Sequence, residues 1–402
     1  MNLLLVADGH YYKDQEGNVY VESIYDYNFF SRYLSVFTSV FAMARIEHVS
    51  IPPDGKKIAS GPNVEFLELP PFKGPWQYLW NYLLIKKKIK THVSDFQCGI
   101  FRMPGAIPNI AAKIFSKTKK PFAIEVVADP WEGFSKGTTR SILRPIIRNL
   151  WTYSLKRKCM QANGVSYVTK RYLQDKYPCY AGINGCNSNY FMSSYSSVEL
   201  SDDKFASARE YVTMSDITIS HVANSFETYG KGHLTLIKAL RIILDHKYNA
   251  RVLFVGDGSL KDEFMKVAKE LNVDKNITFL GRLPNSEAVR SVIKDSDLFV
   301  FPTKAEGLPR ALLEAMAEGL PCVSSPVCGI PEILDNSCLV DYDDYQRYAF
   351  KIIELINNPQ QMNKLSQLNF DTAKKFSNDV LSKRRTAFYI ELKRIAVKNT
   401  KN

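Results

Sequence analysis

The sequence lacks the features of a membrane-spanning, fibrous or disordered chain. No run approaches the roughly 20 apolar residues that a bilayer-spanning helix needs, and no long stretch is dominated by proline, glycine or serine. The first apolar run ends before Asp8, which is too short for the core of a signal peptide, and no basic leader precedes it. We therefore expect a folded, cytoplasmic chain that begins with a strand.

The chain also lacks the sequence patterns of metal and redox sites. Its seven cysteines are an odd number without paired C-x-x-C spacing, and no cluster of histidine, cysteine and aspartate has the spacing of metal ligands. Asp341 and Asp343 form a D-x-D pair, but their position after a predicted strand favours a turn. We expect reduced thiols, no metal and no bound cofactor.

Acidic residues are fewer than basic ones. The chain has 41 acidic and 53 basic residues, which gives a formal net charge of +12. Such a surplus favours an anionic partner, which includes nucleotide phosphates, lipid head groups and nucleic acid. The chain has no recognisable nucleic-acid-binding motif, and its aromatic residues are dispersed. We therefore expect no nucleic acid as a partner.

The length and the order of apolar runs predict two α/β domains. A single core usually stops growing at about 250 to 300 residues, and this chain has 402. Short apolar runs alternate with helical patterns in both halves, which predicts two doubly wound, Rossmann-like domains facing a central cleft. The predicted domains are 1–200 and 201–377, and 378–402 is predicted as a helix that packs back on the first domain.

Individual elements follow from the periodicity of apolar residues. In the first domain, the pattern predicts a helix over 24–44 and a strand over 47–51. In the second, it predicts a last strand over 338–341. Because ligands of such sheets bind at the carboxyl ends of strands, residues in three loops of the first domain are expected to face the cleft: Gly9, His10, Arg102 and Asp129.

The most informative motif begins at a buried strand over 297–301 and continues into a helix. Pro309 suits the first helical turn, and the free amides of Gly307 and Leu308 at its positive end predict a site for phosphate groups. Glu306 precedes the helix and Glu314 lies two turns into it, so their backbones are about 12 Å apart. That separation suits two contacts with one extended ligand, not joint action on a single bond.

A second motif places Lys231 between two glycines, directly before an amphipathic helix. This position allows the lysine to reach a phosphate in the cleft. A third motif places Gly256 after a strand, but the third glycine of a dinucleotide fingerprint would fall at Lys261 and is absent. A dehydrogenase is therefore excluded.

These motifs together resemble the retaining glycosyltransferases of family 4, which have the GT-B fold and include enzymes of bacterial polysaccharide biosynthesis. The hallmark of that family is two glutamates separated by seven residues, as Glu306 and Glu314 are, and the resemblance extends through the second half of the chain. It implies that Glu306 contacts the sugar of a nucleotide sugar donor and that Glu314 binds its ribose hydroxyls. The amides of Gly307 and Leu308 would meet the diphosphate.

The resemblance implies further contacts with the donor. Lys231 would bind the diphosphate, but the arginine that relatives commonly carry five residues earlier is replaced by Phe226. Family members often carry two glycines after the first strand, close to the diphosphate, of which only Gly9 is present. The first domain is expected to bind the acceptor. The expected catalytic residues are Glu306 and Lys231, and the expected donor-binding residues are Gly307, Leu308, Pro309, Arg310, Glu314, Gly256, Gly281 and Arg282.

One predicted helix has the character of a surface-binding segment. Arg140, Arg144 and Arg148 recur every fourth residue beside apolar residues, and the helix ends near Lys158. Such a helix lies on an anionic membrane in some proteins, and in others it is a core helix with a solvated basic face. Both interpretations stay open, and the first would hold the enzyme at the inner face of the membrane.

We therefore predict a metal-independent, hexosyltransferase-type enzyme that moves a sugar, with retention of configuration, to a hydroxyl of a saccharide or lipid-linked acceptor. Surface polysaccharide or glycan synthesis is the expected setting. A sugar-nucleotide epimerase or a phosphorylase on the same fold is the first alternative, and a basic nucleic-acid-binding protein is the second. Donor base, sugar and linkage depend on loop shape, which sequence patterns do not encode.

Overall fold

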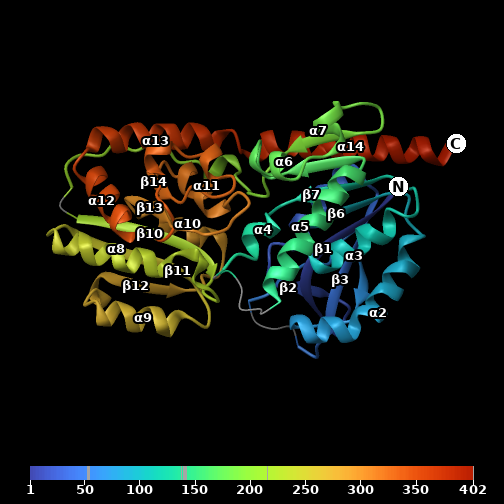
Figure 1. Ribbon diagram of the computed structural model, residues 1–402, viewed down its shortest axis with the longest axis horizontal. Helices are drawn as coiled ribbons and strands as arrows, with labels where there is room; N and C mark the ends of the chain where they lie inside the picture. Colours follow the sequence, from blue (N-terminus) through green and yellow to red (C-terminus); the bar gives the residue numbers. More distant parts are fainter. Residues whose placement is uncertain (52–54, 137, 139–142, 215, 402) are drawn as a thin grey trace.

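The computed structural model describes residues 1–51, 55–136, 138, 143–214 and 216–401. These residues form two lobes that lie side by side, and both termini lie on the first lobe (Figure 1). Each lobe is built around one sheet with helices on its faces. The predicted α/β class with two doubly wound domains is confirmed.

The first lobe holds a sheet whose parallel part runs β5-β3-β1-β6-β7-β8-β9. Two short strands, β2 and β4, extend the end of β1 in antiparallel fashion. The strands are β1 Asn2–Lys13, β2 Val19–Val21, β3 Ser39–His48, β4 Lys57–Ile58, β5 Val64–Leu69, β6 Gly99–Met103, β7 Phe122–Val126, β8 Gly164–Tyr167 and β9 Phe191–Ser194. The helices and 3-10 turns are α1 Tyr27–Ser31, η1 Arg32–Ser35, α2 Gly74–Val93, α3 Ala106–Phe115, α4 Pro130–Gly133, α5 Arg144–Gln161, α6 Tyr172–Lys176 and α7 Tyr180–Asn184.

The second lobe holds a parallel sheet in the order β12-β11-β10-β13-β14 within the described ranges. The chain builds outward from β10 to β12 and then crosses back to β13, so the strand order reverses between β10 and β13. Ligands of open α/β sheets bind at such a reversal. The elements are β10 Asp216–Ser225, η3 Tyr229–Lys231, α8 His233–Asp245, β11 Asn249–Asp257, α9 Lys261–Glu270, β12 Ile277–Gly281, α10 Ser286–Lys294, β13 Leu298–Phe301, α11 Arg310–Ala317, β14 Cys322–Ser324, η5 Ile330–Glu332, α12 Tyr345–Ile356 and α13 Pro359–Lys374, with the turns η2 Asp202–Lys204, η4 Asp274–Asn276 and η6 Asn336–Cys338.

Three predicted elements are wrong, and one is the strand expected over 47–51, because β3 ends at His48. The helix expected over 24–44 is replaced by the short α1 and η1, followed by strand β3. Because β3 lies between β1 and β5 with Val40, Ala42 and Met43 all buried, its sequence run 40–44 is apolar throughout and resembles part of a helix. The strand expected over 338–341 is a single bridge between Ser324 and Leu339, next to η6.

The C-terminal helix α14, Asn378–Lys401, leaves the second lobe and packs along the first, as expected (Figure 1). Its apolar stripe is buried, and it consists of Leu381, Phe388, Tyr389, Leu392 and Ile395. Lys393 Nζ also donates to the carbonyl of Val36 at 2.6 Å. The chain thus crosses between the lobes twice, once between β9 and β10 and once into α14, whereas the exact domain boundaries stay predictions.

Within the described part of the chain, no helix combines the length and the apolar character needed to cross a bilayer.

Candidate active site

Lys231 and Glu306 lie on loops that follow neighbouring strands of the second sheet. Lys231 ends η3 after β10, and Glu306 follows β13. Because β10 and β13 are adjacent, their loops meet, and the amide of Lys304 donates to the carbonyl of Gly230 at 2.8 Å. Lys231 Nζ forms an ion pair with Oε1 of Glu306. The two predicted catalytic residues therefore face each other at the reversal of strand order.

Gly232 makes this meeting of loops possible. It adopts the left-handed conformation with φ of +75°, which glycine adopts without steric cost. A Cβ at this position would overlap the carbonyl of Pro302, at the end of β13. Only a glycine therefore lets the Lys231 turn pack against the strand that leads to Glu306.

The helix that follows Glu306 begins one residue later than predicted. Pro309 is the N-cap, in an extended conformation, and α11 begins at Arg310. Pro309 has no side-chain group that could cap the helix, and in the described ranges no protein acceptor takes the amides of Gly307 and Leu308. Free amides at the positive end of a helix attract anions. The start of α11 is thus suited to a phosphate group, although the residues there precede the helix.

Gly307 also lies where the two lobes approach closely. A Cβ on Gly307 would overlap the carbonyl of Val127, which follows β7 of the first lobe. Gly329 lies beside it: its amide donates to the carbonyl of Gly307 at 3.0 Å, and a Cβ on it would contact Thr169. The glutamate–helix motif is therefore pressed directly against the first lobe.

Glu314 lies farther along α11, at intermediate exposure. It lines a pocket of about 440 Å³ together with α10 residues such as Arg290 and crossing-segment residues such as Lys204. Arg310 is also at intermediate exposure. The predicted ribose contact of Glu314 and the helper role of Arg310 stay predictions.

Phe226 and Gly256 have structural reasons for their positions. Phe226 is fully buried, and its ring lies 4.1 Å from that of His233 between centroids. Gly256 has φ of +130°, and a Cβ there would overlap the carbonyl of Ala223. The position of the missing arginine thus points into the core, and the donor contact predicted for Gly256 stays untested.

Two buried histidines behind Lys231 were not singled out in the sequence. His221 lies on β10, and its Nδ1 donates to the carbonyl of Val300 at 2.9 Å. His233, at the start of α8, has no partner for either ring nitrogen among the described residues. Burial lowers the pKa of His221 to about 4 and that of His233 well below its usual value. Both rings are therefore neutral at physiological pH.

Gly281 and Arg282, predicted to face the nucleobase, lie at the end of β12. Gly281 has φ of +71° in open space, and Arg282 forms an ion pair with Glu22 of the first lobe. Lys56 donates to the same carboxylate at 2.6 Å, and Lys56 and then Arg282 lower the pKa of Glu22. Arg282 thus bridges the lobes, and its contact with a base stays a prediction.

Gly9 and His10 do not lie in a loop, which corrects the sequence prediction. Strand β1 continues to Lys13 with a bulge after Val6, because β2 pairs with its end. Gly9 packs against the ring of Tyr11, and His10 Nε2 contacts Glu47 at 2.9 Å. Both positions are therefore engaged by protein groups.

Asp8 is the residue of this motif that reaches the strand ends. Its carboxylate accepts from Arg45 Nη2 at 2.7 Å and from the amide of Ala106, at the start of α3, at 2.5 Å. It therefore stabilises the helix start that the first lobe presents at the carboxyl end of β6.

Arg102 and Asp129 are buried, not exposed in cleft loops as expected. Arg102 lies on β6 and pairs with Glu125 at 2.7 Å. Asp129 caps α4 and accepts from Lys176 Nζ at 2.6 Å and from Tyr172 at 2.8 Å. A ligand hydroxyl would have to displace one of these donors to reach Asp129.

Glu332 is an interlobe contact that the sequence analysis missed. Its carboxylate accepts from three successive first-lobe amides, those of Lys170 at 2.6 Å, Arg171 at 3.1 Å and Tyr172 at 2.7 Å. These amides open helix α6, so a carboxylate from one lobe caps a helix of the other. The Gly329-Ile330-Pro331-Glu332 motif could have suggested a turn, but nothing in it names the partner.

No group of three or more histidine, cysteine, aspartate or glutamate side chains that could hold a metal ion occurs in the described ranges.

Comparisons with known proteins agree with this arrangement. Protein CapJ of Staphylococcus aureus is 28% identical over 363 residues, which is 89% of this chain and 86% of that protein. An uncharacterized glycosyltransferase of Haemophilus influenzae is 24% identical over 304 residues, or 74% of this chain and 78% of its own length.

Solved structures share the fold at low sequence identity. Sucrose-phosphate synthase from Thermosynechococcus elongatus has a TM-score of 0.66 at 13% identity and covers 98% of this chain and 99% of its own. HepE of Anabaena, in complex with UDP, has a TM-score of 0.64 at 13% identity and covers 96% and 99%.

The fold is the GT-B fold of these solved structures. More particularly, residues 212–370 match the family described as glycosyl transferases group 1. That span contains Lys231, Glu306 and the start of α11, so the family match and the geometry coincide.

Proposed function

We propose that the chain transfers a sugar from a nucleotide diphosphate donor to an acceptor hydroxyl, with retention of configuration and without a metal ion. The observation that carries this proposal is the ion pair of Lys231 and Glu306 beside the free amides at the start of α11. A cation and oriented amides stabilise the negative charge that develops on a departing diphosphate. The site therefore has the parts that this leaving group requires.

The two side chains of the ion pair can also exchange partners when a donor binds. In the closed cleft Lys231 neutralises Glu306, whose side chain is only 17% exposed. A diphosphate at the α11 amides would attract Lys231 and release the Glu306 carboxylate for the hydroxyls of the sugar. Glu314, farther along the same helix, would then bind the ribose, with Gly281 and Arg282 toward the base and Arg310 as a second cation.

Relatives support this class of donor. HepE is solved with UDP, and a pneumococcal O-GlcNAc transferase of similar fold is solved with UDP and GlcNAc. Similarity at 12 to 13% identity concerns the fold, so the uridine donor is a proposal for this chain.

The acceptor we propose is a saccharide or a lipid-linked saccharide in surface polysaccharide or glycan synthesis. One relative over 28% of this chain is the Vi polysaccharide biosynthesis protein of Salmonella typhi. Another, over 39%, is a mannosyltransferase of Corynebacterium glutamicum acting on a phosphatidylinositol monomannoside. These names favour an acceptor that is itself a growing glycan.

A panel of nucleotide sugars incubated with the purified chain tests the reaction. We expect slow donor hydrolysis with one of them, and transfer with retained anomeric configuration, read by NMR, once an acceptor is added. Isomerisation of the donor would indicate an epimerase, and phosphate-dependent cleavage would indicate a phosphorylase. Inversion of configuration would contradict the retaining mechanism.

We also propose that the first lobe rests on an anionic membrane through helix α2. Its inward residues Ile85 and Ile89 are buried, whereas its other face exposes large apolar side chains, namely Trp76, Leu79, Trp80, Leu83 and Leu84. Trp80 is 88% exposed. Exposed tryptophan and leucine on one helix face are typical of segments that lie in a membrane interface.

Charge complementarity favours lipid as the occupant of this face. Lysines 86, 87, 88 and 90 follow the apolar residues on the same helix and are exposed. Each basic residue near an anionic surface contributes about 1 kcal/mol. Helix α3 packs between α2 and α5, so both outer helices lie on one side of the lobe (Figure 1).

Helix α5, where the sequence placed the membrane contact, contributes a smaller part. It exposes Ile146 and Leu150, but Arg148 is engaged with Trp131, donating to its carbonyl at 2.6 Å and lying 3.7 Å from its ring centroid. Arg140 lies outside the described residues. The apolar face of α2 is therefore the principal contact.

Vesicle flotation tests this surface. We expect the chain to float with vesicles that contain phosphatidylglycerol, less with pure phosphatidylcholine, and with neither after the double change Trp80→Ser and Leu83→Ser. The matched control is Phe350→Ser, an exposed aromatic residue on α12 of the second lobe, which should float like the unchanged chain. Flotation of the α2 variant at the unchanged level would sink the proposal.

A further inference from the structure

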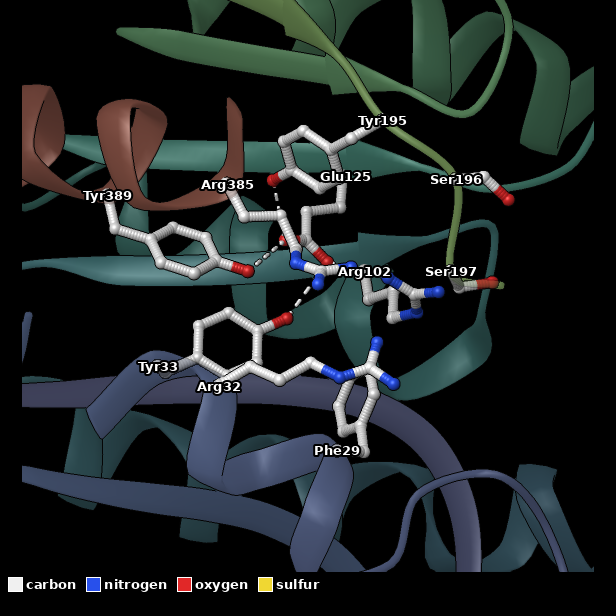
Figure 2. Close-up of a pocket in the computed structure, with 10 residues that line it drawn as sticks. All are labelled: Phe29, Arg32, Tyr33, Arg102, Glu125, Tyr195, Ser196, Ser197, Arg385 and Tyr389. Carbon is white, nitrogen blue, oxygen red and sulfur yellow. Dashed lines mark hydrogen bonds and ion pairs between the residues drawn. The ribbon is translucent and has the colours of Figure 1, made fainter. Parts of the chain in front are cut away.

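Close behind the Val127–Gly307 contact, the first lobe contains a small recess (Figure 2). Glu125, on β7, lies in it and precedes Val127 by two residues, about 7 Å along an extended chain. The recess is bordered by both segments that cross between the lobes, through Ser196 after β9 and Arg385 on α14. It therefore lies in the first lobe, next to both segments that connect the lobes.

The single carboxylate in the recess is fully occupied. Glu125 accepts from Arg102 at 2.7 Å, Tyr33 at 3.0 Å, Tyr195 at 2.9 Å and Tyr389 at 3.3 Å. Burial, and then the carboxylate itself, raise the pKa of all three tyrosines well above the usual value, so they stay protonated and donate. Glu125 has no free lone pair directed at a further cation.

The guanidinium groups outnumber the carboxylates that could pair with them. Arg32, Arg102 and Arg385 come from η1, β6 and α14 and extend into the same space (Figure 2). Arg32 pairs with Glu199 at the surface, and burial followed by the charge of Arg385 lowers its pKa to about 10. Arg385 is 8% exposed, and its buried Nη1 has no partner in the described ranges, as is also true of Arg102 Nε.

A buried cation without a partner is strongly unfavourable, because the charge has lost its hydration and gained nothing in return. Such a group is compensated when an anion binds beside it. We propose that Arg385 and Arg102, with Arg32 at the rim, form a site for an anionic group, a phosphate or a carboxylate, carried by the acceptor.

The size and place of the recess define what it takes. Its enclosed space is only water-sized, far below the roughly 300 to 1,000 Å³ of pockets that enclose a whole small ligand. A charged group of a larger molecule would therefore bind at its mouth, beside Arg32. Because the start of α11 lies on the opposite lobe and takes the donor diphosphate in the proposed function, a group bound here belongs to the acceptor.

Thermal unfolding of the full chain in potassium phosphate, potassium glucuronate and potassium chloride, at equal ionic strength, tests the site. We expect phosphate or glucuronate to raise the unfolding midpoint by about 2 °C at ten times its dissociation constant, relative to chloride. The Arg385→Leu variant should lose this shift. In chloride its midpoint should equal or exceed that of the unchanged chain, since it lacks the uncompensated charge.

Two matched variants locate the anion. Arg394→Leu removes an exposed arginine of the same helix that pairs with Glu391, and it should keep the shift. Lys231→Ala should keep it as well, because the proposed donor site is separate. A shift with phosphate indicates a phosphorylated acceptor, and a shift with glucuronate indicates an acidic sugar.

The inference is overturned if neither anion raises the midpoint, if Arg385→Leu keeps the shift, or if Lys231→Ala abolishes it. A midpoint of Arg385→Leu far below the unchanged chain would likewise assign the arginine a purely structural role. The inference rests on the proposed function only for the identity of the acceptor. Binding needs no transfer, so a failed donor panel and a failed anion shift are separate results.

Discussion

In the second lobe, Lys231 and Glu306 form an ion pair at a partly exposed edge, whereas in the first lobe Glu125 is 1% exposed and accepts four side-chain hydrogen bonds. The first arrangement leaves both charges able to change partners when a ligand arrives. The second fixes its carboxylate completely and leaves a neighbouring arginine unpaired. The second lobe therefore holds an ion pair that can exchange partners, whereas the first lobe holds a carboxylate whose partners are fixed.

The largest effect on stability is expected in the first lobe, where the buried carboxylate of Glu125 has fixed partners. Glu125→Gln weakens the partner of the buried Arg102, and breaking a buried ion pair costs about 3 to 5 kcal/mol. We expect the free energy of unfolding, measured by urea titration, to fall by an amount near the lower end of that range. Glu47→Gln, which alters an exposed pair with His10, should change it by less than about 1 kcal/mol. Equal effects in the two variants would remove the contrast between the lobes.

The mobile pair should respond in activity and not in stability. Lys231→Ala and Glu306→Gln each remove one group that stabilises developing charge, which typically lowers kcat by about 10² to 10³. We expect losses of this size in steady-state transfer, with the unfolding midpoint little changed. Lys238→Ala, an exposed lysine on α8, is the control and should transfer normally. Near-normal kcat in both site variants would overturn the assignment of the site.

A smaller effect is a dependence of stability on pH that arises from two buried histidines in the second lobe. The pKa of His221 is about 4 in the folded chain against a usual 6.5, and that of His233 is also lowered, chiefly by burial. The folded state thus binds fewer protons than the unfolded state, so stability is fully present above pH 6.5 and is lost as pH falls toward 4.

Replacing His233 by leucine should flatten this dependence. His233→Leu also removes two buried nitrogens without partners, which contributes about 1 kcal/mol of stability at pH 7. Unfolding midpoints measured between pH 7 and 5 check both effects, with the exposed His246→Gln as control. An unchanged slope in His233→Leu would show that other groups cause the acid sensitivity.

The candidate site of the second lobe could be predicted from the sequence because most of its residues are close together in the chain. Glu306, Gly307 and the start of α11 follow one another in the chain, and Lys231 lies in the turn after the neighbouring strand β10. Only the exact helix start at Pro309 differed, since a proline serves equally as N-cap or first residue.

For the first lobe, the sequence predicted only the α/β class. Its recess gathers Arg32, Arg102, Glu125 and Arg385 from four separate elements, and no spacing in the chain links them. Gly9 and His10 were assigned to a loop because the pairing of β2 that extends β1 is a long-range contact. Likewise, the exposed apolar face of α2 follows an ordinary helical pattern, and burial alone distinguishes it from a core face.

The carboxylate of Glu332 holds three consecutive backbone amides of the other lobe. Because all three share one acceptor on the other lobe, they lose it together when the lobes part. The amide hydrogens of Lys170, Arg171 and Tyr172 consequently report when the two lobes separate. Their exchange with heavy water requires the lobes to separate, and a ligand that holds the lobes together would slow the exchange of all three.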